Sequence, residues 1–85
     1  MARIRVQEVG EGMHPSEVVV MVRTADGGQE QLIVDKRSLQ DGTLQVGFPV
    51  GSEPGKYLVE LPRETERGSW RIWVSPDQIV QEAAA

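Results

Sequence analysis

The 85-residue sequence contains no cysteine and only one histidine. The absence of cysteine excludes disulfides and thiolate metal sites, and a single histidine excludes a metal site built from several imidazoles. A domain of this length buries only about 60–65% of the surface of its unfolded chain, so its stability usually depends on further support. Once disulfides and metals are excluded, self-association is the remaining support. The alternative is a compact β-barrel that is stable by itself.

Positive charge and long apolar runs are also scarce. Nine basic and thirteen acidic residues give a net charge of −4, which argues against duplex nucleic acid as a partner because such binding depends largely on neutralised phosphates. The longest apolar run covers residues 18–22, far too short to span a membrane. The first residues lack the apolar stretch of a signal peptide, so we expect a cytoplasmic protein with no membrane partner.

Apolar and polar residues alternate with a period of two over most of the chain, which predicts β-strands. We expect strands at residues 2–9, 17–24, 30–34, 43–48, 56–61 and 69–74. The segment 26–28, Asp-Gly-Gly, predicts a tight turn between the second and third strands because these residues tolerate positive φ. The last two strands are expected to pair as a hairpin across residues 62–68.

Two short helical turns are expected where the alternation is lost, at residues 35–39 and 75–79. Asp35 is a suitable N-cap for the first turn, and Pro76 lies near the start of the second, where its missing N–H costs nothing. Short strands separated by turn signals are typical of a sandwich or barrel. The sequence therefore predicts an all-β fold, a small closed or partly open barrel of five to six antiparallel strands with two short helical turns.

The second half of the chain echoes the first at a spacing of 40 residues. When residues 1–40 are set over 41–80 without a gap, the identical pairs are Val6/Val46, Val19/Val59, Arg23/Arg63, Gly28/Gly68 and Val34/Val74. Five identities are about twice what chance would give, and self-similarity of this kind predicts two related structural units. We therefore expect one β-barrel domain over residues 1–80, with pseudo-twofold duplication of 1–40 and 41–80, and a disordered tail over 81–85.

Residues 73–80, Trp-Val-Ser-Pro-Asp-Gln-Ile-Val, resemble the end of SH3-like barrels. In that family a strand runs into a single 3₁₀ turn, often with proline, and then into a last short strand with valine. The resemblance implies barrel closure, so an SH3-like small barrel is the alternative to a duplicated one. The family's acidic ligand-binding loop, paired tryptophan and early tyrosine motif have no matching positions here. Recognition of proline-rich peptides is therefore not implied.

No set of residues predicts catalysis. His14 could act as a general base beside Ser16, but side chains so close in sequence rarely reach the relay geometry, and no third group can be named to orient them. Glu8, Glu11 and His14 are spaced by three, which gathers metal ligands on a helix, whereas this segment is a strand end followed by a glycine-rich loop. We expect no enzyme activity and no catalytic, metal or cofactor site.

The alternation also predicts which side chains face outward. Tyr57, Val59 and Leu61 on one strand, with Trp70, Ile72 and Val74 on the next, are expected inside. The 40-residue offset transfers this assignment to the first half and places Val19 and Met21 inside. The side chains left outside form the candidate interaction face: Val18, Val20, Val22, Ile33, Arg71 and Trp73. The assignment depends on strand register, because a slip of one residue exchanges the two faces.

An apolar outer face predicts a non-catalytic protein-interaction or self-association module, with a second copy or another protein as the partner. Each large apolar side chain left in water forgoes about 1.5–3 kcal/mol of burial, and small monomers rarely expose a patch of this kind. Coverage of the face by the chain's own helical turns is the competing explanation. The alternative function is binding of single-stranded nucleic acid on an aromatic platform, with Arg3, Arg5, Arg71 and Trp73 as contacts.

Overall fold

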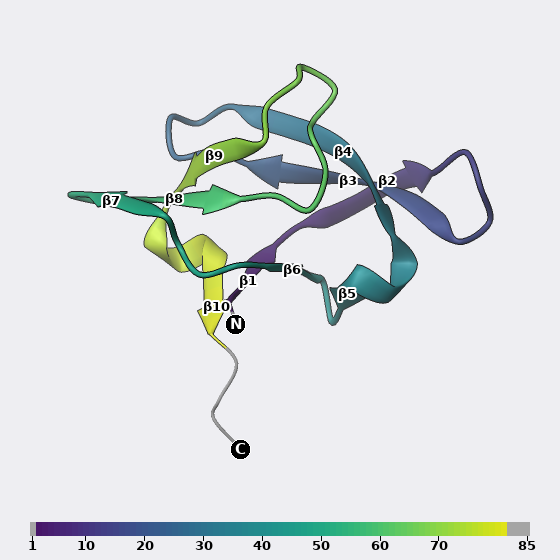
Figure 1. Ribbon diagram of the computed structural model, residues 1–85, viewed down its shortest axis with the longest axis horizontal. Helices are drawn as coiled ribbons and strands as arrows, with labels where there is room; N and C mark the ends of the chain where they lie inside the picture. Colours follow the sequence, from purple (N-terminus) through teal and green to yellow (C-terminus); the bar gives the residue numbers. More distant parts are fainter. Residues whose placement is uncertain (1, 82–85) are drawn as a thin grey trace.

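The chain forms ten short strands and two 3₁₀ turns within residues 2–81, the part that the computed structural model describes (Figure 1). The strands are β1 (Ala2–Arg5), β2 (Gln7–Glu11), β3 (Glu17–Arg23), β4 (Gln29–Asp35), β5 (Leu39–Gln40), β6 (Thr43–Val46), β7 (Gly51–Glu53), β8 (Lys56–Glu60), β9 (Arg71–Val74) and β10 (Ile79–Gln81). The 3₁₀ turns are η1 (Lys36–Ser38) and η2 (Pro76–Gln78). The expected all-β content is confirmed.

The strands form three small antiparallel sheets instead of one barrel. Sheet A has the order β10-β1-β6-β5, sheet B is β2-β3-β4, and sheet C is β7-β8-β9. The predicted barrel of five to six strands, closed or partly open, is therefore wrong, and so is the closure implied by the likeness to SH3-like barrels.

The ladders stop where the chain bends away from its neighbours. A bulge interrupts β2 between Glu8 and Gly10. Among the described residues, the regions of sheets B and C are joined by isolated hydrogen bonds and not by a ladder. One of these runs from the Ala25 N–H to the Trp73 carbonyl over 2.8 Å. A closed barrel needs continuous pairing between all neighbouring strands, and the described strands of sheets B and C are not paired in this way.

One hydrophobic core receives side chains from all three sheets. Its buried members are Ala2, Ile4, Val18, Val20, Val22, Leu32, Val34, Leu44, Val46, Val59, Leu61, Ile72 and Val74. Valine, isoleucine and leucine dominate because branched side chains pack well on pleated surfaces. The core therefore holds the three short sheets together without the closure of a barrel.

Sheet A relates the two halves of the chain by a local twofold axis. On β1 and β6, Ile4 lies opposite Leu44, and these two residues are 40 positions apart. Ile4 also pairs with Ile79 on β10, and Leu44 pairs with Leu39 on β5, so these partners again differ by 40. Both halves contain the same types of element in the same order. Duplication of the sequence stays a prediction, but the pairing in sheet A follows its offset.

Strands β3 and β8 correspond at an offset of 39 residues and not 40. This difference of one residue reverses the predicted inner face of β3. Val20 on β3 lies opposite Leu32, whereas Val59 on β8 lies opposite Ile72. Leu32 and Ile72 are 40 positions apart, but Val20 and Val59 are only 39 apart. Transferring faces from β8 to β3 with a constant offset of 40 is therefore wrong by one residue, which exchanges inside and outside.

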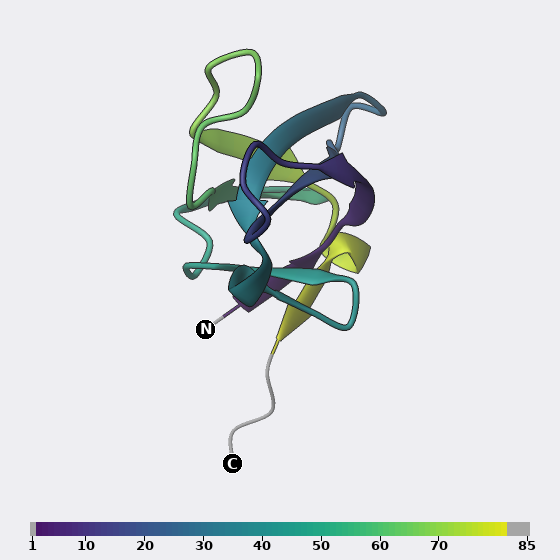
Figure 2. The same ribbon diagram turned by 90° about the vertical axis from the view of Figure 1, so that its right-hand side faces the viewer.

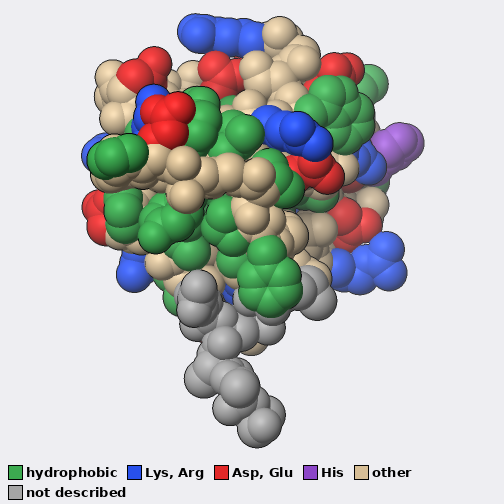
Figure 3. Space-filling view, turned by 60° about the vertical axis from the view of Figure 1, so that its left-hand side comes forward, with side chains coloured by type: hydrophobic (Ala, Val, Ile, Leu, Met, Phe, Trp, Pro, Cys, Tyr) green, Lys and Arg blue, Asp and Glu red, His purple; other side chains and the backbone are tan. Residues whose placement is uncertain are grey.

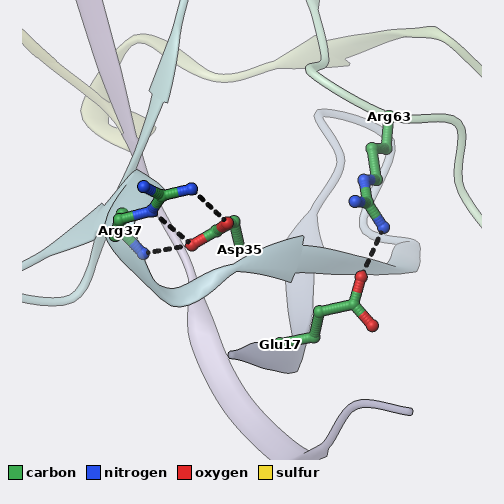
Figure 4. A network of polar contacts seen from close by, with 4 residues as sticks. All are labelled: Glu17, Asp35, Arg37 and Arg63. Carbon is green, nitrogen blue, oxygen red and sulfur yellow. Dashed lines mark hydrogen bonds and ion pairs between the residues drawn. The ribbon is translucent and has the colours of Figure 1, made fainter. Parts of the chain in front are cut away.

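The connection between β8 and β9, residues 61–70, rises at the top of both ribbon views and contacts the first half of the chain (Figure 2). The Thr65 side chain is buried and donates a hydrogen bond to Glu30 over 2.8 Å. Arg63 forms an ion pair of 2.9 Å with Glu17 on β3 (Figure 4). These contacts hold the long connection against sheet B.

Both predicted helical turns are present. The Asp35 carboxylate accepts a hydrogen bond of 2.9 Å from the Arg37 backbone N–H, which confirms it as the N-cap of η1 (Figure 4). Ser75 occupies the N-cap position of η2 without a capping side-chain bond. Of the predicted tail, Gln81 belongs to β10, and residues 82–85 lie outside the described part. No helix in residues 2–81 is long and apolar enough to cross a membrane.

Candidate functional site

The candidate interaction face is not a single surface in the structure. Val18, Val20 and Val22 are buried in the core, so their outward placement was wrong. The cause is the one-residue change of offset between β3 and β8. Ile33 on β4 is half-buried and lies opposite Val19, also half-buried. The apolar face expected on sheet B is therefore largely the inner one.

Trp73 lies on β9 beside other side chains of sheet C and is not an open platform. It is half-buried and lies opposite Leu58 on β8. The Cα of Gly51 on β7 faces Trp73, since a Cβ atom added there would lie in ordinary contact with the ring at 3.9 Å. The Lys56 ammonium lies 4.7 Å from the ring centroid, a distance typical of a cation–π interaction. These contacts already occupy part of the ring surface.

The arginines predicted to contact single-stranded nucleic acid do not share one exposed surface. Arg3 is only 7% exposed, and its Nε donates to Thr43 Oγ1 over 2.7 Å. The expectation that Arg3 faces solvent with Arg5 is therefore wrong. Arg71 is exposed but forms an ion pair of 3.0 Å with Glu60. Only Arg5 of these three is exposed without an ion pair among the described residues.

The sole histidine lies in an exposed loop. His14 and Ser16 are both exposed in the connection between β2 and β3. The backbone turns tightly there, with the Glu17 N–H donating to the His14 carbonyl over 2.9 Å. Within residues 2–81, no group of three or more His, Cys, Asp or Glu side chains could hold a metal ion.

The large exposed apolar side chains lie mainly in the second half of the chain. Phe48, Val50, Tyr57 and Trp70 are 37–67% exposed. Figure 3, which brings the side of β7 and β8 forward, shows hydrophobic side chains in a broad band across this face. The alternation predicts Tyr57 and Trp70 inside, and Phe48 on the face of Leu44. All three predictions are wrong.

Phe48 and Trp70 are exposed because they lie beyond the ends of strands, where alternation no longer sets the face. Phe48 follows β6 and is flanked by Gly47 and Pro49, and Trp70 precedes β9. Glycine and proline commonly mark strand ends. The two residues that flank Phe48 are therefore the sequence signal that separates it from the inner face.

Phe48 and Val50 border an apolar cleft between the end of β6 and the end of β8. This cleft has a volume of about 480 Å³ and is lined by Ser38, Gln45, Val46, Gly47, Phe48, Val50, Glu60, Leu61 and Pro62. Leu61 and Val46 belong to the core. Among the described residues of the lining, Glu60 is the only charged one, and its carboxylate is already paired with Arg71.

A smaller cleft lies where β1, β2, β3 and η2 meet, and we call it the arginine cleft. It has a volume of about 210 Å³ and is lined by Arg5, Val6, Gln7, Met21, Arg23 and Gln78. No carboxylate is among these residues. Two guanidinium groups and two amides therefore surround an apolar floor of Val6 and Met21.

The two clefts occupy corresponding places in the two halves. Four of their lining positions are related by the 40-residue offset, namely Arg5/Gln45, Val6/Val46, Gln7/Gly47 and Gln78/Ser38. A fifth pair, Met21/Glu60, is related by the 39-residue offset of β3 and β8. Val6 and Val46 are both valine, whereas the residues at the other corresponding positions differ in size, polarity or charge. The same architecture thus presents two different chemistries.

A third cleft, of about 340 Å³, separates the β3–β4 turn from β9 and has balanced charges. Asp26 and Glu30 contribute acids, and Lys56 and Arg67 contribute bases. A hydrogen bond from the Thr24 hydroxyl lowers the pKa of Asp26, with further help from the Gly28 N–H. The cleft therefore offers a ligand no surplus of either charge.

Comparison with protein-family models, with curated proteins and with solved structures finds no match to this chain. The functional assignment therefore depends on the geometry and chemistry of the clefts.

Proposed function

We propose that this protein is a non-catalytic self-association module and that the apolar cleft is its interface with a second copy of the chain. The observation that carries the proposal is Phe48, which is 67% exposed at the border of a cleft of about 480 Å³. A twofold-symmetric dimer brings the same patch of both copies together. An apolar projection beside an apolar cleft is self-complementary, because each Phe48 can enter the cleft of the other copy.

The charges around the cleft permit this association although the protein is acidic. Like charges brought together at an interface oppose binding, and the net charge of −4 would favour separation. Within residues 2–81, the lining holds one charged residue, Glu60, and Arg71 neutralises it locally over 3.0 Å. Two copies can therefore meet here without juxtaposing unpaired carboxylates.

Other occupants fit the cleft less well. Single-stranded nucleic acid requires cations along its backbone, and no lysine or arginine is among the described residues that line the apolar cleft. Another protein with an apolar anchor is the competing partner. If another protein is the partner, this protein is a monomer when purified alone. Its mass in solution therefore distinguishes a second copy from a different protein as the occupant of the cleft.

Light scattering over a range of protein concentrations tests the proposal. We expect the mass to rise from 9.4 kDa toward twice this value as concentration increases. Phe48→Ser removes the central apolar contact and should weaken dimerisation at least about tenfold, as loss of an aromatic anchor usually does. Phe48 is exposed, so the variant should remain folded.

Met13→Ser is the matched control, because Met13 is 85% exposed in the β2–β3 loop, outside the apolar cleft. It should leave the dimer unchanged. A wild-type protein that stays monomeric at every concentration contradicts self-association. Equal weakening by Met13→Ser and Phe48→Ser would place the interface elsewhere.

A further inference from the structure

We infer that the arginine cleft binds a small oxyanion, a carboxylate or phosphate group, through Arg5 and Arg23. This site is separate from the proposed dimer interface and does not depend on it. In the part of the chain that the structure describes, its lining has two cationic side chains and no acid. Anion recognition in proteins commonly uses arginine, because its planar guanidinium can donate two parallel hydrogen bonds to carboxylate or phosphate oxygens.

Arg5 is oriented by the fold. Its Nε donates to the backbone carbonyl of Asp77 over 3.1 Å, and this bond limits rotation of the guanidinium. The terminal Nη groups remain as donors. The Asp77 carboxylate accepts a bond of 2.5 Å from the Ser75 hydroxyl and is not among the groups that line the cleft.

Arg23 ends β3 and forms no ion pair among the described residues. Its counterpart 40 positions later, Arg63, pairs with Glu17 over 2.9 Å. Other arginines of the chain also have acidic partners, among them Arg37 and Arg71. In a protein of net charge −4, two neighbouring arginines without carboxylates form a local positive site.

The remaining lining residues suit a small anion. Val6 is half-buried and Met21 is only 9% exposed, so the floor is apolar and offers no carboxylate that would repel an anion. The Gln7 and Gln78 amides can each donate two hydrogen bonds. The volume of about 210 Å³ is below the roughly 300 Å³ of common ligand pockets. It therefore fits a single oxyanion or the anionic end of a longer molecule.

Isothermal titration calorimetry with inorganic phosphate and, separately, with succinate tests this site at constant ionic strength set with chloride. We expect saturable binding of at least one of the two anions. Arg5→Gln and Arg23→Gln should each weaken it about tenfold, the usual effect of losing a charged hydrogen bond. Arg63→Gln is the matched control and should leave binding unchanged, because Arg63 is the counterpart of Arg23 outside this cleft.

The two probes also distinguish the sources of the anion. Tighter binding of phosphate supports a phosphorylated ligand, and tighter binding of succinate supports a carboxylate. Absence of saturable binding by both anions overturns the inference, as does equal weakening by Arg63→Gln. Repeating the titration in the Phe48→Ser variant separates this result from dimerisation. Circular dichroism of each variant shows that its fold is retained.

Discussion

The two clefts show how one architecture can carry two chemistries. Their floors share a valine, since Val6 corresponds to Val46. Their rims differ, since Arg5 corresponds to Gln45. Floor residues must pack against the core, where changes of volume are costly, whereas rim residues face solvent. Packing therefore preserves the shape of each cleft, and the exposed positions are free to diverge.

The halves also differ along their outer strands. β2 is exposed throughout, carries Glu8 and Glu11, and is interrupted by a bulge, features that discourage pairing with another chain. In the second half, the segment before the three-residue strand β7 exposes Phe48 and Val50 instead. The first half is protected from association at this place, and the second half is suited to it.

The largest expected effect concerns the core valines that correspond in the two halves. Val20 and Val59 are both fully buried, so Val20→Ala and Val59→Ala should each lower the free energy of unfolding by about 2–3 kcal/mol. Urea denaturation measures both. Val9→Ala on exposed β2 is the control and should change it by less than about 0.5 kcal/mol. A neutral Val20→Ala would mean that β3 presents its other face to the core.

The next effect concerns Arg3 and Thr43, which are 40 positions apart and hydrogen-bonded to each other across the local twofold axis. Thr43→Val keeps the shape but removes the acceptor of the buried Arg3 Nε. It should cost about 1.5–3 kcal/mol of stability, the range for hydrogen bonds to charged groups.

A double-mutant cycle with Arg3→Met checks whether this loss of stability comes from the hydrogen bond between Arg3 and Thr43. The Arg3→Met/Thr43→Val protein should lose less stability than the sum of the single variants, because the Nε donor and its Oγ1 acceptor are then removed together. Simple additivity would show that the bond between Arg3 and Thr43 contributes nothing to stability.

The smallest effect concerns the caps of the two 3₁₀ turns. Hydrogen bonds from the Arg37 side chain and backbone lower the pKa of Asp35 from its usual 3.8, whereas Ser75 at the corresponding place makes no capping bond. A carboxyl with a lowered folded-state pKa stabilises the protein above its unfolded pKa and loses this contribution as the pH falls through the folded value.

Asp35→Ser should therefore lower Tm slightly near neutral pH, and the difference from wild type should shrink as the pH falls below about 3.8. Thermal unfolding followed by circular dichroism measures this. A difference that stays constant across the acidic range would attribute the effect to lost local packing and not to ionisation of Asp35.

Local sequence signals predict much of the fold. The alternation locates the main strands, the segment 26–28 locates a hairpin turn, and Asp35 is recognisable as a cap. Each of these depends on residues close together in the chain. The arginine cleft is not predicted, although Arg5 is a candidate contact, because Arg23 and Gln78 reach it from distant parts of the sequence.

By itself, the sequence determined the all-β class, the approximate places of the main strands and of the two 3₁₀ turns, and the 40-residue echo that sheet A follows. Only the tertiary structure decided that the strands form three sheets and not a barrel, that Val20 faces the core while Phe48 faces solvent, and that two clefts arise at corresponding places. The physical reason is that strand faces repeat every two residues. A one-residue difference between the halves, set by non-local pairing, therefore exchanges the buried and exposed sides.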